Sequence, residues 1–334
     1  MPRPGPRNLI TDVAGLTVGS AQDEAVRTGV TVLLCPEGWS AAVDVRGGGP
    51  GVRETETLSP ENSFSRAHAI CLSGGSVFGL GAADGVTSAL SVRNVGLRLA
   101  PDTLVIPIVP GAVLHDLRNG GDKAWGIDPP YRALGMAAVE AASEHFELGA
   151  VGAGRGAMAG LVKGGLGSAS IDLGGGLIVG ALVAANPVGS VYMPDGETFW
   201  AWPFEIDGEF GGKVPTGPVS ATEPLPDDSK LGAAGRLRAG ANTTLAVVAV
   251  SADLTTAEAK RVAMMAHDGM GRAVRPAHTA FDGDVVFALA SGVTALGTGS
   301  TRSLEVSRLG SAAADCLARA IARAVHAARD FRES

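Results

Sequence analysis

The segment TTLAVVAVSADL, residues 243–254, runs directly into TTAEAKRVAMMAHDGMGRAV, residues 255–274, and this pair decides the fold. The first stretch is a β-branched apolar run that predicts a strand, and the second predicts a helix. A further apolar run, DVVFALA at residues 284–290, predicts the next strand, and residues 305–330 predict a long C-terminal helix. Because strands and helices alternate, the sequence predicts an α/β layered domain.

Similar elements are expected on the N-terminal side of this pair. The sequence predicts strands at residues 16–20, 29–35 and 177–189, and helices at residues 77–90 and 131–146. Ser76 stands at the start of the first of these helices, where its hydroxyl is placed to cap it. Residues 103–117 predict an apolar strand that is broken by prolines.

Residues 191–240 form the longest segment for which we expect no regular structure. The segment is polar, rich in proline and glycine, and contains the acidic run EPLPDDSK at residues 223–230. These features predict an exposed, irregular connection. It ends at RAGANTTLAVVAV, residues 238–250, so an irregular segment leads directly into the predicted strand.

The composition excludes several classes of protein. The chain has 334 residues, of which 46% are hydrophobic, and this is enough for one large domain or two ordinary ones with a sizeable core; of these we expect the single domain, residues 1–334. The formal net charge of -7 and the lack of a Lys/Arg block exclude nucleic acid as an expected partner. Because the N-terminal stretch MPRPGPRNLITDV has no apolar run of signal-peptide length and no stretch of the chain reaches the length of a membrane span, we expect a cytoplasmic protein that does not contact a membrane.

Metal and cofactor sites are not expected. Cys35, Cys71 and Cys316 lie far apart, without a C-x-x-C pair, and are expected to be buried thiols. The stretch GAGRGA, which begins at Gly152, lacks the third glycine of a dinucleotide-binding loop, and the chain has no G-x-x-x-x-G-K-[ST] motif. The 48 glycines beside 4% aromatic residues instead indicate tight turns and a core packed by small side chains.

The junction between Asn242 and Thr243 has two interpretations. Asn242 can close a turn before a strand, which is the commoner meaning of such a tripeptide. Alternatively, a strained turn lets the Thr243 hydroxyl attack the Asn242 carbonyl, and hydrolysis of the resulting ester makes Thr243 a new N-terminus. Its α-amine, with a reference pKa of about 7.7 to 8.0, would then be the base for its own hydroxyl.

An acidic pair precedes the strand that is predicted at residues 284–290. Asp282 and Asp284 flank Gly283, and side chains two residues apart on extended chain point the same way. The two carboxylates can therefore share a site and influence each other's protonation. Asx turns are the alternative, whereas the spacing of an EF-hand calcium loop is absent.

Lys163 and Asn186 are two further candidates. Lys163 lies in the otherwise neutral stretch GAMAGLVKGGLGS and is either exposed or directed into a pocket. In a pocket, its charge would stabilise an anion or tune the amine of Thr243. Asn186 ends a predicted strand, where it either begins an ordinary Asn-Pro turn or donates its amide N–H to an oxyanion.

The histidines near these motifs show no metal-ligand spacing. We expect His115 and His278 to be hydrogen-bonded structural residues. His267 lies beside Asp268 on a predicted helix, and we expect it on the helix surface.

Eight motifs follow one another in an order that is more specific than any of them alone. They are NLITDVAGLTVG (8–19), TGVTVLLCPEG (28–38), VDVRGGGPGVRET (43–55), HAICLSGGSVFGLGAADGV (68–86), VIPIVPGAVLHDL (105–117), ANPVG (185–189), AGANTTLAVV (239–248) and HTAFDGDVVFALA (278–290). Together they resemble the self-processing aminopeptidase family, which includes L-aminopeptidase/D-amidase-esterases, β-peptidyl aminopeptidases and nylon-oligomer hydrolases. The resemblance covers nearly the whole chain.

The resemblance implies an αββα sandwich similar to that of N-terminal nucleophile hydrolases but differently connected. It also implies self-cleavage into an α chain, residues 1–242, and a β chain, residues 243–334, which stay together. Thr243 would be the nucleophile and its amine the base. The family's pocket lysine would correspond to Lys163, and its oxyanion-binding asparagine to Asn186. Oligomers of such αβ units, typically tetramers, are expected.

The acidic pair indicates a branch of the family. The β-peptidyl aminopeptidases have Ser-x-Glu at the positions of Asp282 and Asp284 and a serine nucleophile, whereas the nylon-oligomer hydrolases have Asn-Thr-Thr and Asp-Gly-Asp. The sequence resembles the second group. It departs from that group at His115, where a tyrosine is usual near the substrate.

The expected activity is hydrolysis of linear amides such as 6-aminohexanoate oligomers. An aminopeptidase that acts on short peptides, amides or β-peptides is the alternative within the same chemistry. Acyl transfer from the same acyl-threonine is a second class, because an amine can replace water as the acceptor. A binding protein with an uncut Asn242–Thr243 bond is a third.

Overall fold

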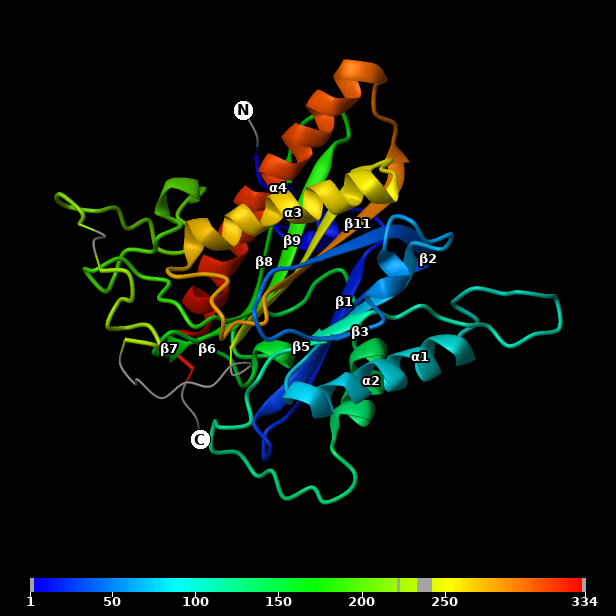
Figure 1. Ribbon diagram of the computed structural model, residues 1–334, viewed down its shortest axis with the longest axis horizontal. Coiled ribbons are helices and arrows are strands. Elements are labelled where there is room, and N and C mark those ends of the chain that lie inside the picture. The colour runs from blue at the N-terminus through cyan, green and yellow to red at the C-terminus, as the bar shows by residue number, and fades with distance from the viewer. Residues whose placement is uncertain (1–2, 221–222, 233–241, 332–334) are drawn as a thin grey trace.

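The computed structural model describes residues 3–220, 223–232 and 242–331. Strands and helices alternate from Thr243 to Ala328, as the sequence predicts, whereas the described parts of residues 17–73 and 158–252 each hold several strands with no α-helix between them (Figure 1). The strands are β1 (Thr17–Asp23), β2 (Thr28–Val45), β3 (Gly51–Arg53), β4 (Arg66–Ser73), β5 (Gly111–Val113), β6 (Met158–Ala159), β7 (Val162–Lys163), β8 (Gly165–Asp172), β9 (Ile178–Asn186), β10 (Thr243–Ala252) and β11 (Val285–Thr294). The α-helices are α1 (Ala82–Val92), α2 (Tyr131–Glu140), α3 (Thr256–Ala273) and α4 (Gly299–Ala328).

Within the described ranges, one sheet has the strand order β3-β5-β4-β2-β11-β10-β9-β8, with β1 beside β2. The long strand β2 joins two halves of this sheet. Its residues 28–34 pair with β1, whereas its residues 40–45 pair with β11. The register with β4 shifts between Leu34 and Trp39, and such a bulge bends a strand. The two halves consequently lie over one another as two layers.

Three buried clusters lie between four layers. Helices α3 and α4 pack on the half that contains β8 to β11, the two halves of the sheet pack on one another, and α1 and α2 pack on β2 and β4. Figure 1 shows the two helix pairs on opposite sides of the strands. The predicted αββα sandwich is therefore confirmed.

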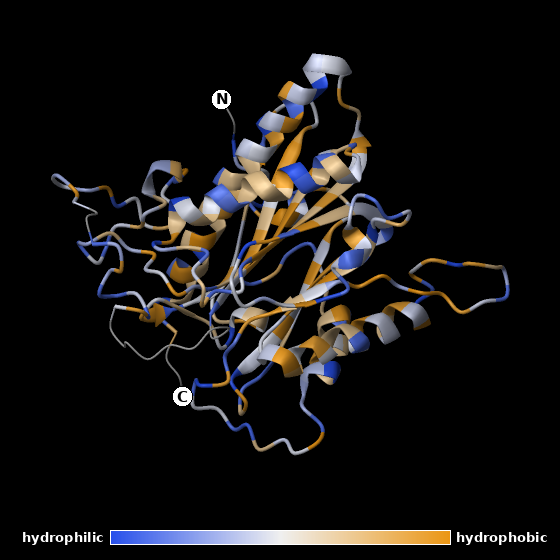
Figure 2. Ribbon diagram, viewed as in Figure 1, coloured by the Kyte–Doolittle hydropathy of each residue, from blue (hydrophilic) through white to orange (hydrophobic). Residues whose placement is uncertain are grey.

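Strand β10 is buried on both faces. Leu245 and Val247 point into the cluster between the sheet halves, whereas Ala246 and Val248 point toward α3 and α4. A strand that is covered on both sides needs apolar residues at every position rather than at alternate ones. This explains the continuous apolar run, and Figure 2 shows the hydrophobic colouring concentrated on the strands between the helices.

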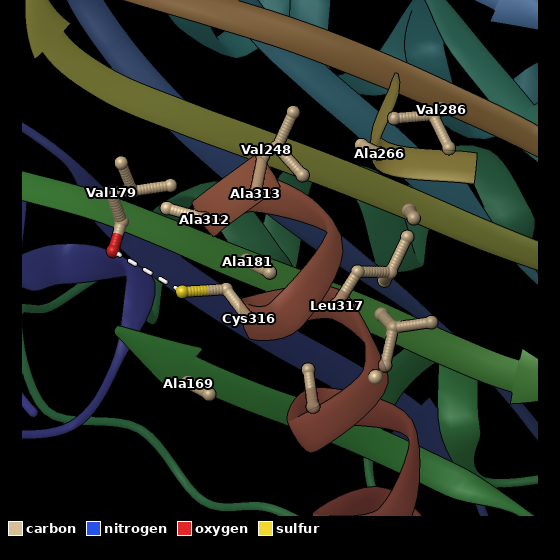
Figure 3. Packing of buried hydrophobic residues seen from close by; sticks show 14 of the residues in the cluster. Ala169, Val179, Ala181, Val248, Ala266, Val286, Ala312, Ala313, Cys316 and Leu317 are labelled. Carbon is tan, nitrogen blue, oxygen red and sulfur yellow. Dashed lines mark hydrogen bonds between the residues drawn. The ribbon is translucent and has the colours of Figure 1, made fainter. Parts of the chain in front are cut away.

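Small side chains bring the helices close to the sheet. Figure 3 shows Cys316 of α4 packed over Ala181, with its sulfur 3.6 Å from the carbonyl oxygen of Val179. A Cβ added to Gly167 would lie 2.0 Å from the Ala320 carbonyl oxygen, so only glycine fits against α4 there. The glycine-rich and alanine-rich composition thus serves close packing of helix on sheet.

The cysteine prediction is confirmed, since Cys35, Cys71 and Cys316 are all free and buried. Burial raises the pKa of each of these thiols to about 12. None of the helices in the described part of the chain is long and apolar enough to cross a membrane.

Two local predictions are wrong. Ser76 does not cap a helix: it has a φ of 53° and opens a 3-10 turn, Ser76–Gly81, that precedes α1. Of the apolar strand predicted at residues 103–117, only β5 forms, because the prolines remove the backbone donors that a longer ladder needs. The region predicted to be irregular has only a short 3-10 turn, Trp202–Phe204, in its described part. Its expected exposure is wrong in part, because Val191, Phe199 and Phe210 are buried in the same core cluster as α3 and α4.

Candidate active site

Thr243 is the first residue of β10, at the end of the layer between the two sheet halves. Its antiparallel partner on β9 is Asn186, and both residues are 2% exposed. Directly opposite residues on neighbouring strands project from the same face of a sheet. The strands therefore bring together the predicted nucleophile and the predicted oxyanion donor, which are far apart in the sequence.

The carbonyl oxygen of Asn242 accepts two hydrogen bonds. The Thr243 hydroxyl donates to it at 2.5 Å, and the backbone N–H of Gly283 donates at 2.8 Å. The hydroxyl thus lies against the carbonyl group of the peptide bond that self-cleavage would break. The Gly283 N–H is already placed to stabilise negative charge on that oxygen.

Gly283 must be a glycine for this geometry. A Cβ at this position would lie 2.6 Å from the Thr243 hydroxyl oxygen and 2.9 Å from the carbonyl oxygen of Gly49. The segment around Gly49 covers the turn from outside, and its N–H donates to the Asp282 carbonyl at 2.8 Å. The RGGGP stretch therefore forms one wall of the site.

The carboxylate of Asp282 is fully buried, and it binds mainly backbone N–H groups of neighbouring segments. It accepts hydrogen bonds from Val188 N at 3.0 Å and from Thr279 N and Oγ1 at 2.9 and 2.7 Å. Burial raises the pKa of Asp282, and the neighbouring charge of Asp284 raises it further. The sequence prediction that the two carboxylates influence each other therefore agrees with the geometry.

Asp284 holds the start of β10. Its carboxylate accepts from Thr244 N at 2.7 Å, and it bonds to the backbone N and the Nδ1 of His278 at 3.1 and 2.8 Å. The side chain is 2% exposed. Asp284 therefore fixes the backbone one residue after the proposed cleavage point.

The amide of Asn186 contacts three groups in the described part of the chain. Its Oδ1 accepts from Met158 N at 3.0 Å and from Lys230 Nζ at 3.2 Å. Its Nδ2 donates to the carbonyl oxygen of His115 at 3.3 Å. His115 thus meets the site through its backbone, while burial lowers the pKa of its half-buried imidazole.

Two lysines lie near this end of the sheet, and they have different neighbours. Lys163 ends β7, where its Nζ donates to the Arg155 carbonyl at 2.8 Å and lies 5.2 Å from the ring centroid of Phe331. The lysine whose ammonium contacts the side chain of Asn186 is Lys230 rather than Lys163. Lys230 is not predicted as a site residue, because the composition of its segment, EPLPDDSK, indicates only an exposed acidic connection.

A pair of histidines extends the site toward α3. His267 is 1% exposed, which corrects its expected place on the helix surface. Its Nε2 lies 3.0 Å from the Asp44 carbonyl oxygen, and its ring meets that of His278 edge to face at 4.8 Å. The reason is tertiary: the turn that carries His278 covers this face of α3.

The surface beside the site is hollowed. One pocket of about 310 Å³ is lined by Tyr192, Trp200, Asp228 and Arg275, among others, and adjoins the segment that carries Lys230. A second lies between Arg275 and His278. No group of three His, Cys, Asp or Glu side chains that suits a metal ion occurs in the part of the chain that the structure describes.

The αββα sandwich thus places a buried hydroxyl at the start of a central strand, with an amide opposite it and an acidic turn beside it, and such an arrangement suits the hydrolysis of an amide bond. The model of peptidase family S58 matches residues 8–334. The chain belongs to peptidase family S58, and is accordingly an aminopeptidase or amidase of that family.

The relatives agree with this assignment. An uncharacterized aminopeptidase of Mycobacterium tuberculosis is 44% identical over 330 residues, which cover 94% of this chain and 92% of the relative. A 6-aminohexanoate-oligomer endohydrolase of a Kocuria species is 33% identical over 330 residues, covering 94% and 84%. The family resemblance found in the sequence is therefore confirmed.

Solved structures show the same fold. The L-aminopeptidase D-Ala-esterase/amidase of Ochrobactrum anthropi, described as a variant of the Ntn hydrolase fold, superposes with a TM-score of 0.69 at 21% identity and covers 98% of this chain and 88% of that one. A β-aminopeptidase of a Burkholderia species superposes with a TM-score of 0.68 at 24% identity, covering 97% and 88%.

Proposed function

We propose that this protein is a self-processing amidohydrolase whose nucleophile is Thr243, freed by cleavage of the Asn242–Thr243 bond. The observation that carries the proposal is the Asn242 carbonyl oxygen, which is held by the Gly283 N–H while the Thr243 hydroxyl lies 2.5 Å away. The Gly283 bond is also the pairing contact of the parallel bridge between Asn242 and Asp282, so a plain turn into a strand would make it as well. The contact of the hydroxyl is not part of strand pairing, and it supports an attack by this hydroxyl on the carbonyl group.

The processing step is an N-to-O acyl shift followed by hydrolysis. The Thr243 oxygen forms a bond to the Asn242 carbonyl carbon, the Asn242–Thr243 C–N bond breaks, and the hydroxyl proton passes to the departing nitrogen. The oxyanion of the intermediate keeps its bond to the Gly283 N–H. Water then hydrolyses the ester, which leaves the Asn242 carboxylate on residues 1–242 and a free amine on residues 243–334.

In the mature enzyme, the Thr243 amine takes the hydroxyl proton while the oxygen attacks the substrate carbonyl. The Nδ2 of Asn186 donates to the oxyanion that forms there. Asp282 and Asp284 hold the turn and set the charge of the site, and Lys163 is the second cation that the family resemblance assigns to it. Water releases the acyl group, and no cofactor takes part in these steps.

We propose linear amides such as 6-aminohexanoate oligomers as substrates, which the relative at 33% identity supports. An aminopeptidase activity on short peptides is the second candidate, because the mycobacterial relatives at 44% identity are named aminopeptidases. Assaying an oligomer with a free amine and the same oligomer with its amine acetylated distinguishes them. An aminopeptidase hydrolyses only the first, whereas an endohydrolase acts on both.

Two further properties belong to the proposal. The αβ units would assemble as homo-oligomers, with a tetramer as the expected state, which light scattering measures directly. Transfer of the acyl group to an added amine, as in an acyltransferase, would compete with hydrolysis, and product analysis with and without the acceptor measures that competition.

The experiment that tests the function is the intact mass of the purified protein beside its Thr243→Ala and Thr243→Ser variants. We expect two pieces of roughly 24 and 9 kDa by proportion of chain length, with the smaller one beginning at Thr243. The serine variant should still be cut and the alanine variant should remain whole and inactive. A wild-type chain that stays at 33.5 kDa would exclude self-processing.

A further inference from the structure

Lys230 lies in the described part of the irregular connection, on the segment that precedes the cleavage point. Its backbone N–H donates to the Val188 carbonyl at 2.9 Å, and the preceding residue, Ser229, is fully buried in a turn closed onto Pro226. These bonds tie the segment to the end of β9. The position of Lys230 is therefore set by backbone contacts to the candidate site.

The ammonium of Lys230 lies against one residue of the site. Its Nζ is 3.2 Å from the side-chain oxygen of Asn186 and 3.4 Å from the backbone oxygen of the same residue. Met158 N donates to the same side-chain oxygen at 3.0 Å. An ammonium and a backbone N–H can only donate hydrogen bonds, so both contacts require an oxygen opposite them.

These two donors determine which way the Asn186 amide points. If the amide turned over, its NH2 group would face an ammonium and an N–H, and both hydrogen bonds would be lost. In the observed orientation the Nδ2 lies on the other side and donates one hydrogen to the His115 carbonyl at 3.3 Å. Among the described residues the Nδ2 has no other hydrogen-bond partner, which leaves its second hydrogen for an oxyanion.

We propose that Lys230 is a positioning residue of the active site, whose ammonium fixes the Asn186 amide so that its Nδ2 faces the oxyanion formed beside Thr243. The inference rests on the proposed function of Asn186 and Thr243. The connection before the cleavage point would then do more than link the two future chains. After cleavage it would end the α chain and keep Lys230 in the site.

The surroundings of Lys230 set its charge. Burial lowers the pKa of Lys230 to about 7, and the opposite charge of Asp282 acts against this shift. Burial lowers the pKa of His115, which follows β5 in the chain, and the positive charge of Lys230 lowers it slightly further. The ammonium is present below the pKa of Lys230 and is lost above it, so support for the oxyanion declines as the pH rises.

The test measures kcat and kcat/KM from pH 5 to pH 10 for the processed wild type and its Lys230→Met and Lys230→Arg variants. Lys230→Met should lower kcat by about 10- to 100-fold, because a displaced donor loses much of its effect, and should remove the decline on the alkaline side. Lys230→Arg, which stays charged, should retain most activity and keep it to higher pH. Lys213→Met, at an exposed lysine paired with Glu197, is the matched control and should change neither.

The outcomes separate this inference from the proposed function. If the wild type is uncut or inactive, the proposed function fails, whatever the lysine variants do. If the wild type is cut and active but both Lys230 variants keep its kcat and its pH profile, only the positioning role fails. Should Lys230→Met not fold, as thermal denaturation would show, the alkaline limb of Lys230→Arg decides: a shift to higher pH supports the role and an unchanged limb overturns it.

Discussion

The two sides of the cleavage point are built differently. On one side, the acidic turn at residues 279–284 directs its carboxylates mainly to backbone N–H groups, and its glycine leaves room for the Thr243 hydroxyl. On the other side, Asn186 meets an ammonium, a backbone N–H and a carbonyl oxygen. The first side holds the chain in place, whereas the second presents a hydrogen-bond donor to the reaction. Changes on the first side should therefore affect self-cleavage most.

We expect the largest effect on the rate of self-cleavage from Gly283→Ala. The added Cβ would lie 2.6 Å from the Thr243 hydroxyl oxygen, so the hydroxyl or the turn must move away from the Asn242 carbonyl group. A shift of about 1 Å costs on the order of 100-fold in rate, and we expect self-cleavage to slow by at least that factor. The measurement is the fraction of cut chain over time after rapid purification, by intact mass.

Gly271→Ala on α3 is the matched control, because nothing lies within 4 Å of a Cβ there. It should be cut at the wild-type rate. Equal rates for the two alanine variants would mean that Gly283 does not position the nucleophile, and the contrast between the two sides would lose its strongest support.

We expect Asp284→Asn to slow self-cleavage as well, but by a smaller factor. The carboxylate of Asp284 holds Thr244 N at 2.7 Å and His278 Nδ1 at 2.8 Å, and hydrogen bonds to a charged acceptor are worth about 1.5 to 3 kcal/mol. The amide keeps one acceptor but is neutral. We expect self-cleavage to slow by roughly 10- to 30-fold, with Asp268→Asn at an exposed position of α3 as the control.

Asp284 also distinguishes the two sides after cleavage. If it only holds the chain, the Asn variant that has finally been cut should hydrolyse substrate within about threefold of the wild type. A loss of kcat as large as the loss of cleavage rate would instead place Asp284 in the catalytic step itself, together with Asn186.

Much of this site could be predicted from the sequence. Residues such as Thr243, Asn186 and Asp282 stand at strand ends or in turns next to them, and the apolar runs predicted which segments are strands. Strand pairing then brings these residues together. The order of the family motifs indicated the αββα fold, and in that fold these strands are expected to pair.

Lys230 and His267 could not be predicted, and for a shared physical reason. Lys230 lies in an acidic, proline-rich stretch whose composition is typical of an exposed loop, yet its backbone is bonded to the end of β9. His267 lies on a helix face that becomes buried only because the turn with His278 covers it. Both placements depend on contacts between distant segments, and no local pattern reports such contacts.

We expect the smallest effect on self-cleavage at neutral pH from His267→Gln, which lies on the same side of the site as the acidic turn. Burial lowers the pKa of His267 to about 4, so its neutral form is favoured in the folded protein. The stability that follows is fully present above the unfolded pKa of about 6.5 and is lost as the pH falls toward the folded value. The glutamine variant should be cut within about twofold of the wild-type rate at pH 7, because the Nε2 contact with the Asp44 carbonyl can be replaced by an amide N–H.

The free energies of unfolding of the two chains should diverge only at acidic pH. In the uncut Thr243→Ala background, the free energy of unfolding in urea should fall by about 3 kcal/mol more between pH 6.5 and pH 4 in the chain that keeps His267 than in its glutamine variant, since each unit of pKa shift corresponds to about 1.4 kcal/mol. Comparing the two chains removes the contribution of every other titrating group. Parallel declines would show that His267 is not held neutral, and that the acidic turn is less firmly packed on α3 than the edge-to-face contact of His267 and His278 implies.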